Sequence, residues 1–223
     1  MLAIDTIVVP QGAEYQAVCR GLQQGGAANL QVITIPIGFD NIKQILANYF
    51  KQLANSKQII IIGLCGSLSK SYGIGDQVLV QSCQDFRGNR VDLNAELTAK
   101  IHAKLSLDSV AGLTSDRLIF QAQEKYEFGQ KYNAKVVEME GYGYVKELQQ
   151  QGKSVAMLRV VSDDLAGDLP NLNNIIDSQG NIKVVAMAIA FLKQPIAALR
   201  LIRGSLIGLK ALESITAKLF DTS

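Results

Sequence analysis

Short apolar runs alternate with amphipathic stretches of helical length along residues 4–164. The run at 58–64 is almost wholly apolar, which is typical of a strand buried on both faces. The pattern predicts strands at 4–9, 30–37, 58–64, 76–82, 108–115, 134–140 and 154–164, and helices at 14–23, 41–55, 120–132 and 141–152. Strands that alternate with helices indicate an α/β domain with a parallel or mixed sheet.

The pattern changes from residue 181 onward. Residues 184–192 are nearly all apolar, Pro195 interrupts them, and a second helical pattern follows at 196–220. There, apolar residues spaced by three or four form one stripe: Leu199, Ile202, Leu206, Leu209, Leu212, Ile215 and Leu219. We predict a domain at 1–180 and a C-terminal helical extension at 181–223 that packs on it or beside it.

Two interpretations of this stripe stay open. Arg200, Arg203, Lys210 and Lys218 accompany the leucines, a composition that suits a helix lying at an anionic membrane surface. The same spacing is equally typical of a helix packed on its own sheet or on a second subunit. We expect a homo-oligomer, a dimer or higher, and peripheral membrane contact through this helix is the alternative use. Residues 184–192 are too few to cross a bilayer.

Between predicted elements, the polar connection at 164–177 contains Gly and Pro and is long for a loop. Connections of this length are often functional, so we expect a mobile active-site loop here.

Composition and charge exclude several classes of protein. The chain is 48% hydrophobic and 19% charged, which suits a folded domain with a sizeable core. The net charge is only +2, tryptophan is absent and aromatic residues make up 6%, so a nucleic-acid-binding surface is not indicated. We expect no nucleic-acid partner. The N-terminus has no basic segment before its short apolar run, so we expect a cytoplasmic protein.

The cysteines and the histidine limit the chemistry further. Cys19, Cys65 and Cys83 fit neither paired disulfides nor the spacing of a zinc site, and the chain has one histidine, His102. His102 lies in an amphipathic stretch, so we expect an ordinary surface residue. We predict no metal and no cofactor, with phosphate the one co-substrate to consider.

Two acidic motifs follow predicted strands. Glu138 and Glu140 stand two residues apart where a strand gives way to a helix, so extended backbone places them on one side. Either the two glutamates form part of a functional site, or they only stabilise the helix by placing negative charge near the positive end of its dipole. Ser162 and Asp163 end a buried strand, at the edge where α/β folds bind ligands, or else one of them caps a helix. A glycine-rich stretch at 63–76 has no phosphate-loop or dinucleotide fingerprint and by itself predicts a tight turn.

Taken in order, these motifs resemble the purine nucleoside phosphorylase and methylthioadenosine/S-adenosylhomocysteine nucleosidase superfamily. A first strand with an acid after it, Glu14, is followed by GLCGSL at 63–68, GDQV at 75–78, VEME at 137–140 and RVVSD at 159–163. The likeness covers about residues 4–165. It implies a three-layer α/β/α sandwich with a central mixed sheet, plus two C-terminal helices.

For the sugar of a nucleoside, the resemblance implies carboxylates. Glu140, beside Met139, is similar to the residue that grips the ribose hydroxyls, and Glu138 lines the same pocket. Glu14 resembles the acid that activates water in the nucleosidases. Carboxylates suit these places because cleavage of an N-glycosidic bond builds positive charge on the ribose.

For the base, the resemblance implies an acid. Asp163 looks like the group that donates a proton to N7 of a purine, with Ser162 and Arg159 orienting it. That proton relieves the negative charge left on the base, and holding it at neutral pH requires a raised pKa for Asp163. The expected site also includes Gly66, Leu118 and Ile119, and Leu118 stands where the nucleosidases have an aromatic residue.

Two positions depart from the phosphorylase pattern. Where phosphorylases of this group place an arginine and a serine on phosphate, this chain has Ile61 and Leu64. A phosphate dianion buried against apolar side chains is costly. Hydrolysis is therefore favoured over phosphorolysis. Phosphate dependence would point to other arginines: Arg87, Arg90 or Arg117.

The C-terminal segment is similar in pattern to the tail of the hopanoid-associated phosphorylases, which are thought to remove adenine from adenosylhopane. The leading prediction is an enzyme that cleaves the N-glycosidic bond of an adenine-type nucleoside with an apolar 5′ substituent, such as adenosylhopane or methylthioadenosine. Three alternatives stay open. They are a nucleoside sensor without turnover, a phosphorylase with a non-standard phosphate site, and an interaction module whose pocket is vestigial.

Overall fold

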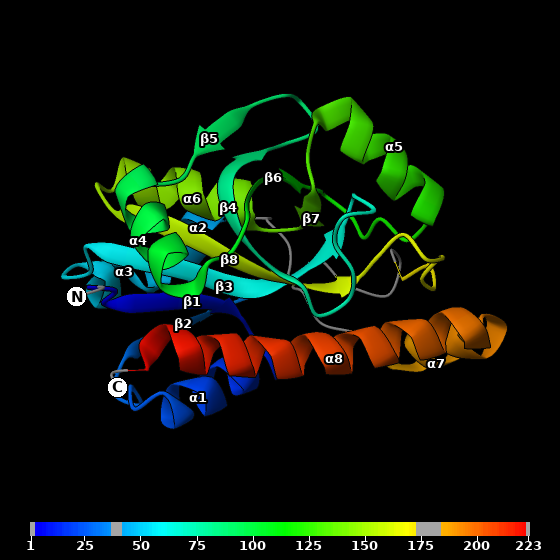
Figure 1. The fold of residues 1–223 in the computed structure, drawn as a ribbon, viewed down its shortest axis with the longest axis horizontal. Coiled ribbons are helices and arrows are strands. Elements are labelled where there is room, and N and C mark those ends of the chain that lie inside the picture. Colours follow the sequence, from blue (N-terminus) through cyan, green and yellow to red (C-terminus); the bar gives the residue numbers. More distant parts are fainter. Residues whose placement is uncertain (1–2, 37–41, 173–183, 222–223) are drawn as a thin grey trace.

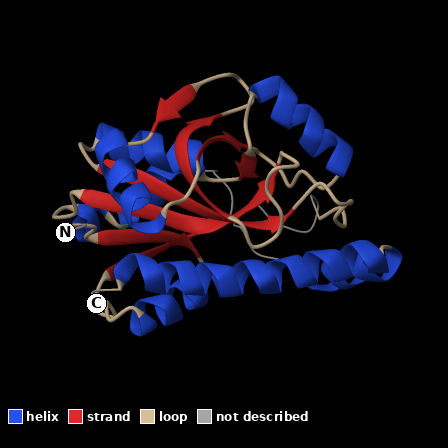
Figure 2. Cartoon of the chain, viewed as in Figure 1, coloured by secondary structure: helices blue, strands red, loops and turns tan. Residues whose placement is uncertain are grey.

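The computed structural model describes residues 3–36, 42–172 and 184–221. Figure 1 shows the fold and Figure 2 its helices and strands. The strands are β1 (Thr6–Pro10), β2 (Gln31–Ile35), β3 (Gln58–Ser67), β4 (Gln77–Gln84), β5 (Arg90–Asp92), β6 (Ser109–Thr114), β7 (Val136–Glu138) and β8 (Ser154–Asp163). The helices are α1 (Ala13–Gln24), α2 (Ile42–Asn48), α3 (Phe50–Leu53), α4 (Ala95–Leu105), α5 (Ala122–Tyr132), α6 (Gly141–Gln150), α7 (Val184–Lys193) and α8 (Pro195–Phe220).

β3 and β8 are the central strands of the sheet. They pair in parallel along their whole length, from Gln58 beside Ser154 to Gly66 beside Asp163. On the edge of β3 that faces away from β8 lies β1, which in turn pairs with β2. On the edge of β8 that faces away from β3 lies β4, in the antiparallel direction. β4 pairs with β6, β6 with β7, and β7 with the end of β3, so these strands and β8 form a closed ring. The sheet is mixed, as the sequence predicts.

Helices cover both faces of this sheet. Ile59 and Ile61 of β3 pack in one core cluster with residues of α2, α3 and α6. Ile60 and Ile62 point the other way and pack with residues of α1, α4 and α8. Successive strand residues face opposite sides, so a strand covered on both faces must be apolar at every position. The predicted three-layer α/β/α sandwich is confirmed.

The two halves of α8 have different surroundings. Leu212, Ile215 and Leu219 are almost wholly buried in the cluster that α8 shares with α1 and the central strands. Leu199 and Leu206, in the first half, are exposed. In Figure 1, α8 runs beside α1 along one face of the sheet, and its first half reaches beyond the ends of the strands together with α7. Packing on its own sheet therefore accounts for only the second half of the predicted stripe.

The structure differs from the sequence prediction in detail. The helix predicted at 41–55 is divided into α2 and α3, because the backbone at Tyr49 (φ −101°, ψ 7°) leaves the helical region. The three-residue strand β5 was not predicted, since it is too short to show a pattern. Of the predicted loop at 164–177, the described part, 164–172, is irregular, and 173–177 lie outside the described residues.

Candidate active site

A pocket opens where β3, β7 and β8 end. Nine of the ten predicted site residues line it: Glu14, Gly66, Leu118, Ile119, Glu138, Met139, Glu140, Ser162 and Asp163. Leu64, Cys65, Arg117 and Val137 complete the lining. The tenth predicted residue, Arg159, is fully buried behind these side chains. Segments far apart in the sequence are thus brought together. β3 and β8 are parallel and end side by side, and β7 pairs in the antiparallel direction with the end of β3.

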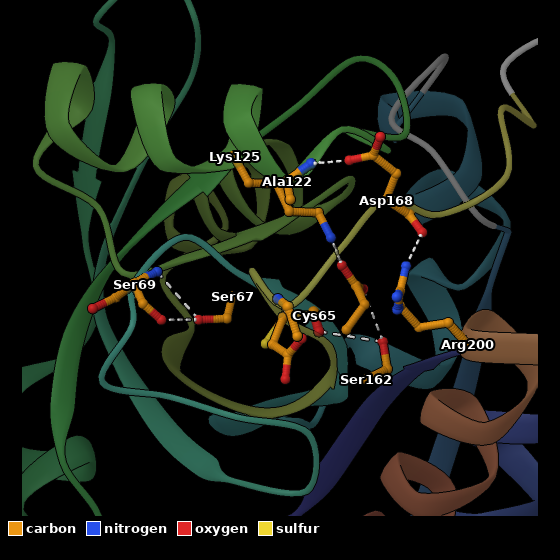
Figure 3. A network of polar contacts seen from close by, with 11 residues as sticks. Cys65, Ser67, Ser69, Ala122, Lys125, Ser162, Asp168 and Arg200 are labelled. Carbon is orange, nitrogen blue, oxygen red and sulfur yellow. Dashed lines mark hydrogen bonds and ion pairs between the residues drawn. The ribbon is translucent and has the colours of Figure 1, made fainter. Parts of the chain in front are cut away.

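Asp163, the last residue of β8, is held by two donors. The Ser162 hydroxyl donates to its Oδ2 over 3.3 Å. The ammonium of Lys125 donates to its Oδ1 and forms an ion pair inside the protein. Figure 3 shows Lys125 reaching from α5 toward the strand edge that carries Ser162. A Cβ built on Gly66 would lie only 2.8 Å from Oδ1 of Asp163, so the absence of a side chain at Gly66 makes room for this carboxyl.

The surroundings of Asp163 act on its pKa in opposite directions. Burial raises the pKa, because a carboxylate loses its hydration there. The charge and hydrogen bond of Lys125 and the hydrogen bond from Ser162 lower it, and the net direction is upward. Asp163 therefore holds its proton to a higher pH than an exposed aspartate does.

Lys125 was missed in the sequence analysis, although its helix was predicted. It is fully buried, which is rare for a lysine without a charged partner. The available signal was its place on the helix: Phe128, Gly129 and Tyr132 follow at three, four and seven residues, so Lys125 lies on the face that packs inward. A lysine on such a face needs a carboxylate, but the sequence does not show which one.

Both carboxyl oxygens of Glu138, at the end of β7, accept hydrogen bonds. Its Oε1 accepts a hydrogen bond from the Thr114 hydroxyl at 2.5 Å. Its Oε2 accepts from the backbone N–H groups of Glu140 (3.1 Å) and Gly141 (2.6 Å), where α6 begins. The structural alternative considered for the two glutamates thus holds for Glu138, which caps a helix as well as lining the pocket.

Arg159 contacts Glu138, not Asp163. Its Nη2 donates to Oε2 of Glu138 over 2.6 Å. The prediction that Arg159 orients Asp163 is therefore wrong, and a β-bulge supplies the reason. β8 has one extra residue at Ser162, because Cys65 pairs with Val161 but Gly66 pairs with Asp163. The bulge changes the alternation of side chains and turns Asp163 away from the side that Arg159 occupies.

The buried guanidinium of Arg159 balances the carboxylates of the site. Burial lowers its pKa, but the charges of Glu138, Glu140 and Glu14 outweigh that effect and hold the pKa above its ordinary value. Among the described residues its Nε and Nη1 atoms have no hydrogen-bond partner. Arg159 therefore acts mainly as a fixed positive charge behind the pocket.

Glu14, near the start of α1, reaches the glycine-rich end of β3. Its Oε2 accepts a hydrogen bond from the backbone N–H of Leu64 at 2.6 Å. Burial raises the pKa of Glu14, while the Leu64 N–H and the charge of Arg159 lower it. A Cβ on Gly63 would lie 2.7 Å from Oε2 of Glu14 and still closer to Arg159, so this position requires glycine.

Glu140 is the N-cap residue immediately before α6 and is 5% exposed. β7 ends at Glu138, so the two glutamates are not both in extended backbone as the sequence analysis assumed. Both nevertheless line the pocket, with Met139 between them. After Asp163, residues 164–172 form no helix, so the alternative that Ser162 or Asp163 caps one is wrong.

A family model described as the phosphorylase superfamily matches residues 11–194. The chain belongs to this superfamily. Solved structures with the same fold include a 5′-methylthioadenosine nucleosidase from Arabidopsis thaliana, with 15% identity, a TM-score of 0.67, and coverage of 97% of this chain and 94% of that one. A putative 5′-methylthioadenosine/S-adenosylhomocysteine nucleosidase from Francisella philomiragia has 15% identity, a TM-score of 0.69 and 98% coverage of both chains. The futalosine hydrolase of Helicobacter pylori has 14% identity, a TM-score of 0.63, and coverage of 94% and 95%. A search of curated proteins found no match.

Within this superfamily, the two apolar departures from the phosphorylase pattern occupy different places. Ile61 is fully buried in the core, away from the pocket, whereas Leu64 lines the pocket. Of the three arginines considered as substitutes, Arg117 lines the pocket, and it forms an ion pair with Glu124 (Nη2 to Oε1, 2.5 Å). Arg87 and Arg90 do not line it.

The histidine and the cysteines have no predicted role in the site, and of these residues only Cys65 lines the pocket. His102 is exposed on α4, as expected, with its Nδ1 2.6 Å from the carbonyl oxygen of Leu107. Cys19, Cys65 and Cys83 are free thiols. Burial raises the pKa of Cys65 well above its ordinary value, so this pocket-lining cysteine is a neutral thiol rather than a nucleophile. That the reaction needs no metal or cofactor stays a prediction.

Proposed function

We propose that the protein hydrolyses the N-glycosidic bond of a purine nucleoside. The observation that carries the proposal is the arrangement of Asp163 on one wall of the pocket with Glu14 and Glu140 in the same lining. Cleavage of this bond leaves negative charge on the base and positive charge on the sugar. A pocket that offers a carboxylic acid to one and carboxylates to the other stabilises both.

On the base side, Asp163 donates a proton to N7 of the purine. Its pKa is raised by burial, which keeps the acid protonated nearer to neutral pH. The Ser162 hydroxyl holds Oδ2 over 3.3 Å, and Lys125 holds Oδ1, so the carboxyl group is oriented at both oxygens. The base itself packs against Leu118 and Ile119.

On the sugar side, Glu140 binds the ribose hydroxyls and Glu14 activates water. Burial raises the pKa of Glu14 too, which opposes the role of a base. The Leu64 N–H and the charge of Arg159 act against burial and favour the ionised form. The two carboxyl groups have different neighbours: Glu14 accepts from the Leu64 N–H near the charge of Arg159, whereas Asp163 accepts from the Lys125 ammonium and the Ser162 hydroxyl. Because a cation acts on each of them, the roles are assigned from position: Asp163 ends β8 on the base side, and Glu14 lies on the sugar side.

For the substrate we propose an adenine-type nucleoside with an apolar 5′ substituent, such as methylthioadenosine or adenosylhopane. The apolar lining by Leu64 and Met139 supports an apolar group near the sugar. Two of the structures with the same fold are described as nucleosidases of 5′-methylthioadenosine, which supports the same substrate class.

The experiment measures base release from adenosine and methylthioadenosine by chromatography. We expect Asp163→Asn and Glu140→Gln each to lower the rate about thirty- to a thousand-fold, or about 2–4 kcal/mol of barrier. Asp92→Asn is the matched control, since Asp92 is an exposed aspartate that does not line the pocket. Near-normal turnover by Asp163→Asn would contradict the role of proton donor. Nucleoside binding without base release would favour a sensor.

A further inference from the structure

The outward side of α7 and of the first half of α8 is an exposed apolar surface. Nine large apolar side chains are exposed in the part of the chain that the structure describes, and seven of them lie between Ile189 and Ile207. Leu192, Ile196, Leu199 and Leu206 are each more than 60% exposed. Single exposed leucines are ordinary on protein surfaces, but a contiguous group of this kind marks an interaction site.

The opposite side of α8 packs closely against the end of β8. A Cβ on Gly208 would lie 3.1 Å from Leu64 and 3.3 Å from Ser162, and Gly204 lies against the Ser162 carbonyl. The close contact seats α8 on the end of β8. The exposed residues follow at three- and four-residue spacing on the opposite side: Ile196, Leu199, Arg203, Leu206 and Lys210. The apolar side chains of this half therefore cannot turn inward without lifting the helix from the sheet.

The charges around the exposed surface have one sign. All five charged residues between Asp177 and Glu213 are lysine or arginine. Of these, Lys193, Arg203 and Lys210 are exposed. Arg200 instead faces the body of the protein, where its Nη1 donates to the Asp168 carbonyl over 2.8 Å (Figure 3). Residues 178–212, which include both helix segments, therefore combine exposed leucines with cations and contain no acidic residue.

We propose that α7 and the first half of α8 dock on an anionic lipid bilayer, with the exposed leucines and isoleucines at the acyl boundary. Long basic side chains within an apolar helix face can extend their charged ends to the headgroups while their stems stay in the apolar layer. Anionic headgroups then neutralise Lys193, Arg203 and Lys210. The contact is peripheral. Within the described residues, no helix combines the length and apolarity needed to cross a membrane.

A second copy of the chain fits this surface less well. A two-fold interface brings the same patch of both copies together. Arg203 and Lys210 of each copy would then face helix segments without an acidic residue, so no carboxylate of these segments would compensate their desolvation. Charge complementarity therefore favours an anionic bilayer over self-association through this face.

Docking would hold the pocket beside the bilayer, because Leu64 and Ser162 line the pocket and contact the same helix. The proposal does not depend on the catalytic one. Membrane binding and base release from soluble nucleosides are measured separately, so either can fail alone.

The test is flotation of the full chain with vesicles of phosphatidylcholine, with or without phosphatidylglycerol. We expect the wild type to float with the anionic vesicles. The fraction of protein that floats with the neutral vesicles should be at least ten-fold smaller. Leu199→Ser with Leu206→Ser, and separately Arg203→Gln with Lys210→Gln, should each lower the bound fraction at least ten-fold. Matched controls are Tyr126→Ser, an exposed apolar residue on α5, and Lys70→Gln with Lys131→Gln, exposed lysines elsewhere.

All variants should keep the wild-type melting temperature and release adenine from adenosine at the wild-type rate. No binding to anionic vesicles, or equal binding by the variants and controls, would overturn the proposal. So would a loss of oligomeric state in Leu199→Ser with Leu206→Ser, measured by sedimentation without vesicles, because the surface would then be an interface between copies.

Discussion

The buried ammonium of Lys125 forms an ion pair with Asp163, the carboxyl group that ends β8. Thirty-eight residues separate them in the chain. Burial raises the pKa of Asp163, and Lys125 opposes that rise. The pair therefore sets the pH at which Asp163 gives up its proton, which is the property that a proton donor to a leaving base depends on.

Lys125→Met should move the alkaline limb of the pH profile of kcat/KM to higher pH. Without the cation, burial and the charge of Asp164 raise the pKa of Asp163, and only the weaker Ser162 hydrogen bond lowers it. The pKa therefore rises further, and the active, protonated form persists to higher pH. The measurement is base release from adenosine across a pH series. Lower turnover at the optimum is expected as well, because one oxygen of Asp163 loses its orienting donor.

The control for this variant is Lys131→Met, the same change at an exposed position of the same helix. It should leave the profile where it is in the wild type. A limb that stays in place or moves to lower pH in Lys125→Met would show that Asp163 is not the group whose deprotonation ends activity.

Gly66→Ala should lower turnover by displacing Asp163. The added Cβ would lie 2.8 Å from Oδ1 and 3.2 Å from Oδ2 of Asp163, which is closer than carbon and oxygen approach without strain. Overpacking of this kind typically lowers the free energy of unfolding by about 1–3 kcal/mol, so we expect lower thermal stability. Because Asp163 must move to make room, we also expect an at least ten-fold loss in kcat. Gly73→Ala is the control, because the nearest atom to its Cβ would be Oδ2 of Asp164 at 4.0 Å, an ordinary contact distance. Wild-type kcat in Gly66→Ala would show that the position of Asp163 is not critical.

Phosphate should not be required for turnover. Ile61 is fully buried in the core, and Leu64 uses its N–H to bind Glu14, so neither offers a group to a phosphate dianion. We expect the same rate of base release with and without phosphate, and free sugar as the product. Strict phosphate dependence with a sugar 1-phosphate product would refute hydrolysis. In that case Arg117, which lines the pocket, is the first arginine to replace.

The fold was predictable because its signals are local. Each face of β3 is buried, so its run of isoleucines alone indicates a central strand. The acids of the site were predictable for a related reason, since Glu138 and Asp163 each end a predicted strand, which is where α/β folds place their ligand sites. Such features can be recognised in a few consecutive residues, without any knowledge of tertiary contacts.

The partners of these acids were not predictable. On β8, simple alternation places Arg159 and Asp163 on the same side of the strand, and only the bulge at Ser162 separates them. A bulge depends on how two strands pair, which the sequence of one strand does not show. The pairing of Lys125 with Asp163 depends in the same way on how α5 is placed over the sheet.

Leu212→Ala and Leu206→Ala should separate the two halves of α8 by stability. Leu212 is 0% exposed within the core, so its truncation leaves a cavity and should lower the free energy of unfolding by about 2–5 kcal/mol. Leu206 is 64% exposed, so the same change should alter that free energy by no more than about 0.5 kcal/mol. Denaturant unfolding of both variants, read by circular dichroism, gives the comparison. A large loss in Leu206→Ala would mean that its side chain is covered in solution by a second copy of the chain.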